Sequence, residues 1–168
     1  MIFIKKWFFI GILFIIAGGS LLHFTYEWSN RNFIVGLFSA QNESVFEHTK
    51  LLILPILLWY ILSYKFSVIK PDKKKYFASM IISLIISILT IPLLFYTYKV
   101  GFNLNNAFIN IFNFCISGVF GQLIAYHYYK YGTYILPEFL IILLILLLII
   151  IYTFFSIYPL KLPIFETF

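Results

Sequence analysis

Long apolar runs separated by short polar segments dominate the pattern of this chain. A helix needs about 20 apolar residues to cross the hydrocarbon core of a bilayer. Runs of about this length predict helices over residues 3–26, 45–64, 76–98, 107–129 and 134–158. The last run is the clearest, because no polar residue interrupts Phe139 to Ile151. We therefore predict an all-α polytopic transmembrane bundle of five spans, forming a single integral membrane domain over residues 1–168.

The segment between the first two spans, residues 30–41, is too short to cross a membrane but has an apolar pattern of its own. Phe33, Ile34, Leu37 and Phe38 fall on one face of a helical period. Amphipathic helices of this kind lie in the plane of the membrane interface. We expect residues 30–41 to form a short interfacial helix over the outer surface.

The composition, 62% hydrophobic and 11% charged, agrees with a membrane protein, and the basic residues indicate its orientation. Cytoplasmic loops carry an excess of Lys and Arg. A cytoplasmic N-terminus and an extracytoplasmic C-terminus leave Arg31, Lys50, Lys99 and Lys161 outside. The same orientation places the larger basic group inside: Lys5, Lys6, Lys65, Lys70, Lys73, Lys74, Lys75 and Lys130. We expect the Lys-rich loop between the second and third spans to contact anionic lipid, and we expect no nucleic-acid partner. The sequence does not indicate an oligomeric state.

A cleavable signal peptide is the alternative interpretation of the first span. Lys5 and Lys6 precede the apolar run, and the small residues 17–20 (AGGS) resemble a cleavage site. Cleavage there would leave an even number of spans and reduce the charge asymmetry. We therefore favour an intact first span.

Two short stretches, residues 23–29 and 42–50, contain three of the six acidic residues and two of the three histidines. A charge near the centre of a bilayer costs roughly 2.5 to 3.5 kcal/mol, so such a dense group favours a functional site. His23 and Glu27 are four residues apart and share a helix face. Together with Asn42, Glu43, Glu47 and His48, they predict an outward-facing polar pocket at the outer ends of the first two spans.

Helix capping is the structural alternative for part of this group. Residues 44–47 (SVFE) match a capping box, in which the Ser side chain accepts a backbone N–H while the Glu side chain reaches back to the Ser N–H. Capping would explain Ser44 and Glu47. It would leave His23, Glu27, Glu43 and His48 without a structural explanation.

A divalent metal is one candidate cofactor, with His23, Glu27, Glu47 and His48 as its tentative ligands. Imidazole and carboxylate groups bind zinc, and three protein ligands plus a water are typical of catalytic sites. The sequence has no His-Glu-x-x-His motif. Glu47 and His48 point about 100° apart on a helix, so both reach one ion only from a distorted first turn.

The fourth span carries a polar stripe, formed by Asn106, Asn110, Asn113 and Ser117 at helical spacing. The stripe reaches about halfway along the span. It favours a cavity open to the outside, with Asn110 and Asn113 as further ligand-binding candidates. Hydrogen bonds between packed helices are the alternative role for these Asn residues. The fifth span has no polar group in its core and is expected to face lipid.

The polar stretches also carry a resemblance to a known family. Residues 23–29 (HFTYEWS), 35–38 (VGLF), 42–50 (NESVFEHTK) and Pro55 resemble the signature of small bacterial multi-pass membrane proteins classed as a domain of unknown function. Phe46 stands where that signature usually has Trp. Family members end in a Pro-Leu-Phe-x-Asp-Pro tail, from which residues 163–168 (PIFETF) depart after a similar beginning. The resemblance implies a bacterial cell membrane as the location, and it implies no established activity or cofactor.

Three functions fit these observations. The first is an integral membrane protein whose outward-facing pocket binds a small polar ligand, a lipid headgroup or an ion. The alternative is a membrane-embedded, metal-assisted hydrolase or transferase acting on lipid, with Glu43 or Glu47 as general base. The second alternative is a small transporter or an accessory subunit of one.

Overall fold

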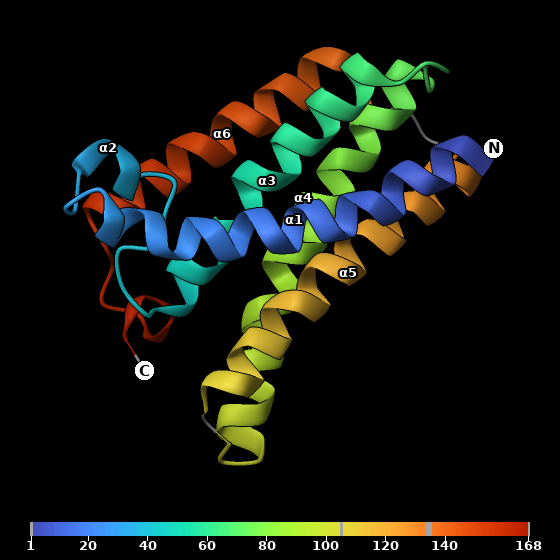
Figure 1. The fold of residues 1–168 in the computed structure, drawn as a ribbon. Helices are drawn as coiled ribbons and strands as arrows, with labels where there is room; N and C mark the ends of the chain where they lie inside the picture. The colour runs from blue at the N-terminus through green and yellow to red at the C-terminus, as the bar shows by residue number, and fades with distance from the viewer. Residues whose placement is uncertain (1, 105, 134–135, 168) are drawn as a thin grey trace.

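Five long helices run back and forth in the computed structural model, which describes residues 2–104, 106–133 and 136–167 (Figure 1). They are α1 (Ile2–Trp28), α3 (Val45–Phe66), α4 (Lys73–Tyr96), α5 (Ala107–Tyr131) and α6 (Glu138–Ile157). A π-helical turn, η1 (Thr97–Gly101), extends α4, and the short helices are α2 (Phe33–Gly36) and η2 (Pro163–Phe165). All five long helices are long and apolar enough to cross a membrane, which confirms the expected all-α class with five candidate spans. Tyr134, the expected start of the fifth span, and Phe168 lie outside the described residues.

The starts of α3, α4 and α5 are set by polar side chains just before each apolar run. Ser44 precedes α3, and its side chain accepts the Glu47 N–H. Asp72 accepts the Lys75 N–H at the start of α4, and Asn106 accepts the Ile109 N–H at the start of α5. These caps satisfy backbone donors that a first helical turn leaves without partners.

The helices α4 and α5 pack closely against each other because small residues line their contact. At Gly121 of α5, an added Cβ would overlap Ser87 Oγ and lie 2.8 Å from the Ser83 carbonyl oxygen of α4. Ser87 Oγ donates to the Ser117 carbonyl at 3.1 Å, and Gln122 Nε2 donates to Ser83 Oγ at 2.9 Å. Close backbone approach and hydrogen bonds of this kind are typical of helix pairs in membranes.

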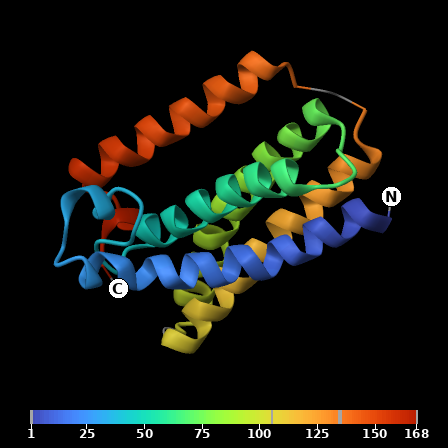
Figure 2. The same ribbon diagram turned by 45° about the horizontal axis from the view of Figure 1, so that its top comes forward.

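The outermost long helix is α6, which lies along the edge of the bundle beside α3 (Figures 1 and 2). Ile141 is its single buried residue in the described part of the chain. Apolar side chains such as Phe139 and Ile150 are 71% and 63% exposed. An apolar face of this extent suggests contact with the lipid bilayer. Near its C-terminal end, however, α6 also carries two polar side chains that bond to α3, Tyr152 and Ser156.

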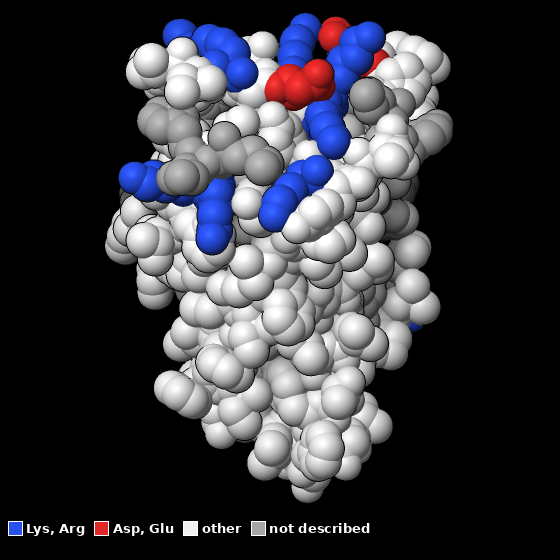
Figure 3. Space-filling view, turned by 90° about the vertical axis from the view of Figure 1, so that its right-hand side faces the viewer, with Lys and Arg blue, Asp and Glu red and all other residues white. Residues whose placement is uncertain are grey.

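The alternating helix directions give the bundle two ends. The histidine end contains the end of α1, the helix α2, the start of α3 and the C-terminal segment, whereas the lysine end contains the N-terminus and the α3–α4 connection (Figures 1 and 2). Figure 3 looks towards the lysine end and shows basic side chains gathered across its upper part. There Lys73 Nζ lies 3.2 Å from Glu138 Oε2 and links α4 to α6. Which end faces the cytoplasm stays a prediction.

The helix that we expected at the membrane interface, over residues 30–41, is shorter in the structure. α2 covers residues 33–36 rather than 30–41, and the chain after it folds back against α1. Ser39 is fully buried there, accepting the Tyr26 N–H at 3.1 Å and donating to the Leu22 carbonyl oxygen. Gln41 Nε2 donates to the Gly36 carbonyl oxygen at 2.8 Å. These tertiary hydrogen bonds replace the helical ones that the apolar pattern had suggested.

Candidate functional site

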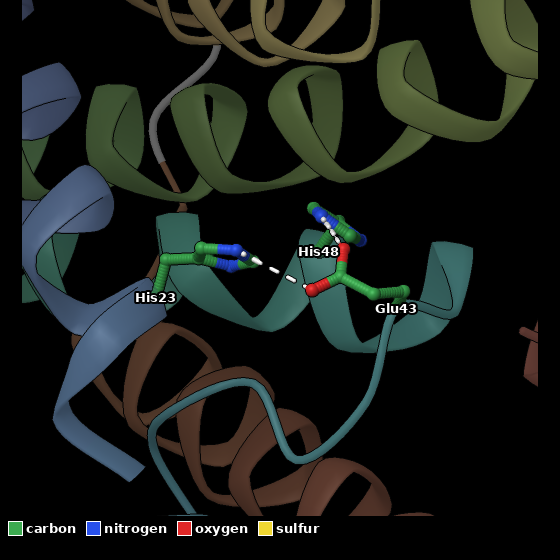
Figure 4. Close-up of side chains that lie close together, drawn as sticks. All are labelled: His23, Glu43 and His48. Carbon is green, nitrogen blue, oxygen red and sulfur yellow. Dashed lines mark ion pairs between the residues drawn. The ribbon is translucent and has the colours of Figure 1, made fainter. Parts of the chain in front are cut away.

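Three side chains from separate parts of the chain meet at the histidine end. His23 comes from the last turns of α1, Glu43 from the loop before α3, and His48 from the first turn of α3. The Glu43 carboxylate lies between the two rings (Figure 4), with Oε1 3.5 Å from His23 Nε2 and Oε2 3.4 Å from His48 Nε2. Side-chain exposure is 29% for His23, 58% for Glu43 and 16% for His48. This histidine cluster is therefore held by two helices and is most open to its surroundings at Glu43.

The first turn of α3 orients His48. Asn42 Oδ1 accepts the Ser44 N–H at 2.9 Å, and Ser44 Oγ accepts the Glu47 N–H at 3.3 Å. The Ser44 carbonyl oxygen lies 2.9 Å from His48 Nδ1. Because a carbonyl oxygen only accepts, His48 Nδ1 carries the proton of this hydrogen bond. The helix start therefore directs His48 Nε2 towards Glu43.

A cavity of about 290 Å³ adjoins the histidine cluster, between α1, α3 and the start of α5. Its polar wall is formed by Ser20, His23, Glu43, His48 and Asn110. Its other walls are formed by Gly19, Phe24, Leu51, Ala107, Ile111 and Phe114. Phe24 and Ile111 are also exposed on the outer surface of the bundle. A polar group at one side and apolar walls at the other suit an amphiphilic ligand.

Comparison with known proteins places the chain in a family. Residues 1–167 match the sequence model of a family described as Family of unknown function (DUF6512). The chain belongs to this family. The match confirms the expected relationship to an uncharacterised family of unknown function. No curated protein and no solved structure matches the chain.

Glu27 lies apart from the histidine cluster. Its Oε1 is 3.2 Å from Arg31 Nε, and the two side chains are 64% and 70% exposed. The chain turns sharply after α1, where Asn30 and Arg31 both have a positive φ, of 54° and 57°. This turn brings Arg31 back beside the helix end. Glu27 thus pairs with Arg31 instead of joining His23, although their spacing along the helix favours a shared face.

Glu47 also faces away from the histidine cluster, into a buried ion pair with Lys50. The two residues are 3% and 2% exposed, and Lys50 Nζ lies 2.6 Å from Glu47 Oε2. The expected capping box is half formed: Ser44 caps the helix, but the Ser44 N–H bonds to Asn42 instead of Glu47. The tentative metal set of His23, Glu27, Glu47 and His48 is therefore not assembled, and Glu43 is the carboxylate that lies between the histidines. Glu47 is likewise poorly placed to be a general base.

The three Asn candidates divide between cavity and packing roles. Asn42 supports the start of α3, as described above. Asn110 lines the cavity, and its Oδ1 accepts from Tyr98 Oη at 2.6 Å. Asn113 is 4% exposed, and its Nδ2 donates to the Ile91 carbonyl oxygen of α4 at 3.0 Å. Asn113 therefore makes the interhelical hydrogen bond that was the alternative to ligand binding.

The partners of the Glu47 side chain were not identified from the sequence. Lys50 Nζ donates to the Gly36 carbonyl oxygen at 2.7 Å and to Ser156 Oγ at 3.0 Å, in addition to its contact with Glu47. Glu47 accepts from the Gln41 N–H at 2.8 Å and from Ser156 Oγ at 3.3 Å. We call this set the Glu47 network. The spacing of Glu47 and Lys50 on one helix face was a usable local signal. Ser156 gave no such signal in the sequence, because it lies 109 positions beyond Glu47 on another helix.

Proposed function

We propose that this protein is an integral membrane protein whose pocket at the histidine end binds the headgroup region of a lipid-type amphiphile. The observation that carries the proposal is the position of the histidine cluster in the polar wall of a cavity of about 290 Å³ whose other walls are apolar. Pockets of roughly 300 Å³ and above hold small ligands. This volume suits a headgroup and the carbons next to it, while the remainder of the amphiphile would lie along the outer surface near Phe24 and Ile111.

The state of His23 supports a ligand in this position. Its Nδ1 atom is buried and has no hydrogen-bond partner among the described residues. An unsatisfied buried polar atom costs about 1 to 3 kcal/mol. Because this atom is buried, a hydroxyl, amine or water in the adjoining cavity would supply the missing partner only after the His23 ring turns towards the cavity.

The test compares a substitution that would fill the cavity with a matched substitution that would not. Ser20 lines the cavity from α1, whereas Leu13 lies seven residues earlier on the same helix and is 71% exposed. Native mass spectrometry of protein from nanodiscs containing phosphatidylethanolamine, phosphatidylglycerol and cardiolipin would report the lipid that survives detergent exchange. We expect the wild type and Leu13→Phe to retain one lipid molecule and Ser20→Phe to lose it. Equal retention in Ser20→Phe, or no retained lipid in the wild type, would contradict the proposal.

A metal-assisted hydrolase or transferase acting on that lipid is the second candidate. Glu43 favours it, because this carboxylate is exposed and adjoins both histidines and the cavity. The check is the mass of the retained lipid after prolonged incubation with zinc. A product missing an acyl chain or headgroup supports an enzyme, and an unchanged lipid removes this candidate.

A further inference from the structure

We infer that His23, Glu43 and His48 form a binding site for one divalent metal ion of the zinc class. This inference rests on the proposed function, because the ion would bind to the same histidine cluster that lines the proposed pocket. A separate experiment tests it. One ligand atom from each side chain can be chosen so that all three atoms lie within 4.8 Å of one another. Figure 4 shows the carboxylate reaching between the two rings.

The orientation of His48 is the first argument. Its Nδ1–H donates to the Ser44 carbonyl, so the neutral ring has its lone pair on Nε2, which lies 3.4 Å from Glu43 Oε2. A lone pair facing a carboxylate oxygen is repulsive unless a cation lies between the two atoms. Metal-binding histidines commonly donate their second ring N–H to a backbone carbonyl in this way, which fixes the tautomer and orients the ring.

The distances are the second argument. Zinc bonds of about 2.0 to 2.1 Å to nitrogen and oxygen place neighbouring ligand atoms of a tetrahedron roughly 3.3 Å apart. The two carboxylate contacts of the histidine cluster measure 3.5 Å and 3.4 Å. These two contacts use different oxygens of Glu43, and the ligand atoms of the three side chains lie within 4.8 Å of one another. Binding of one ion therefore requires the three side chains, including the exposed Glu43, to move closer together. Two imidazole nitrogens and one carboxylate favour zinc and related metals over magnesium and calcium, which prefer oxygen ligands.

The charges around the histidine cluster are the third argument. The basic residues nearest in sequence, Arg31 and Lys50, are paired with Glu27 and Glu47. The ion pairs found for Glu43 among the described residues are those with the two histidines. With neutral rings, the cluster carries one negative charge, and a divalent ion would leave one positive charge. That positive charge would face the cavity, where a fourth ligand such as water or a headgroup phosphate completes the coordination.

The direct test is zinc binding by the intact, chelator-treated protein in detergent, measured by isothermal titration calorimetry and elemental analysis. We expect one zinc ion per chain and no comparable binding of magnesium. Changing a residue that only orients a ligand already lowers metal affinity by roughly 10- to 100-fold, so we expect His48→Ala to lower it by about 100-fold or more. Glu43→Gln, an isosteric change in an exposed loop side chain, should lower it at least tenfold. His127→Ala is the matched control, because His127 is exposed and packs against Tyr131 on α5, close to the α5–α6 connection.

The outcomes separate this inference from the proposed function. No zinc binding by the wild type overturns the inference, since a shared proton then explains the contact between His48 and Glu43. Unchanged affinity in folded Glu43→Gln and His48→Ala protein overturns it as well. Lipid retained by metal-free protein leaves the pocket proposal intact while the metal inference fails. Zinc bound without any retained lipid supports the metal inference and contradicts the pocket proposal.

Discussion

Two carboxylates four residues apart, Glu43 and Glu47, lie on either side of the start of α3 in opposite environments. Glu47 is 3% exposed, and its oxygens accept from Lys50, Ser156 and the Gln41 backbone. The Glu43 side chain is 58% exposed and contacts two ring nitrogens. A buried charge that is fully hydrogen-bonded contributes to structure, whereas an exposed carboxylate beside two imidazoles retains capacity for a ligand. The comparison supports a structural role for the Glu47 network and agrees with the binding role that we propose for the histidine cluster.

The Glu47 network joins three separate parts of the chain. Lys50 Nζ has three donors, and they reach Glu47, the Gly36 carbonyl and Ser156. The first partner lies on α3, the second on α2 and the third on α6. Thr49 adds a second link to α6, through a 2.8 Å hydrogen bond with Tyr152. The network therefore holds the loop and the outermost helix against the start of α3.

The largest expected effect comes from Glu47→Gln. Removing one partner of a buried ion pair typically costs about 3 to 5 kcal/mol, because the remaining charge is left buried without compensation. We expect the variant to lose at least about 3 kcal/mol of stability and its melting temperature to fall by roughly 10 °C, measured by circular dichroism in detergent. Zinc affinity of the folded fraction should stay within threefold of the wild type.

A double variant serves as the control for this prediction. Replacing a buried ion pair by apolar residues of similar volume is often neutral. The double variant Glu47→Leu, Lys50→Met should therefore be more stable than Glu47→Gln alone. A melting temperature for Glu47→Gln equal to that of the wild type would mean that the Glu47 network is not structural.

Ser44→Ala tests the two regions together, because Ser44 contacts both. Its side chain caps the Glu47 N–H, whereas its main-chain carbonyl accepts from His48. Loss of such a cap costs about 1 kcal/mol. We expect that loss in thermal unfolding with little change in zinc affinity, because the carbonyl remains in place. A tenfold loss of zinc affinity would show instead that the two regions depend on each other.

The fold was predictable from the sequence to the extent that apolar length decides it. The five long helices follow the five apolar runs, and the Ser44 cap followed from residue type and position. The partner of Glu47 was not predictable in the same way. Its environment depends on the buried loop around Ser39 and Gln41 and on Ser156 of α6. Contacts between distant segments leave no periodic signal in the sequence.

The histidine cluster was only partly predictable, because it too depends on contacts between distant segments. His23, Glu43 and His48 were all candidates, because a dense group of ionisable residues is costly close to the hydrocarbon core of a membrane. Choosing between Glu27 and Glu43 required the path of the chain after α1. The positive φ angles at Asn30 and Arg31 redirect that path. Nothing in the spacing of the five acidic and histidine candidates along the sequence indicated this turn.

Glu27→Gln gives the smallest expected effect and tests that choice. Exposed ion pairs contribute about 0 to 1 kcal/mol, so the loss of the contact between Glu27 and Arg31 should change stability by less than about 0.5 kcal/mol. Zinc affinity should equal that of the wild type in calorimetry, in contrast to the tenfold loss expected for Glu43→Gln. Both substitutions remove one exposed carboxylate at the same end of the bundle, so long-range electrostatic effects on the metal should be similar. A difference between the two variants therefore reports direct coordination by Glu43, and equal losses would mean that the histidine end attracts zinc only through its overall charge.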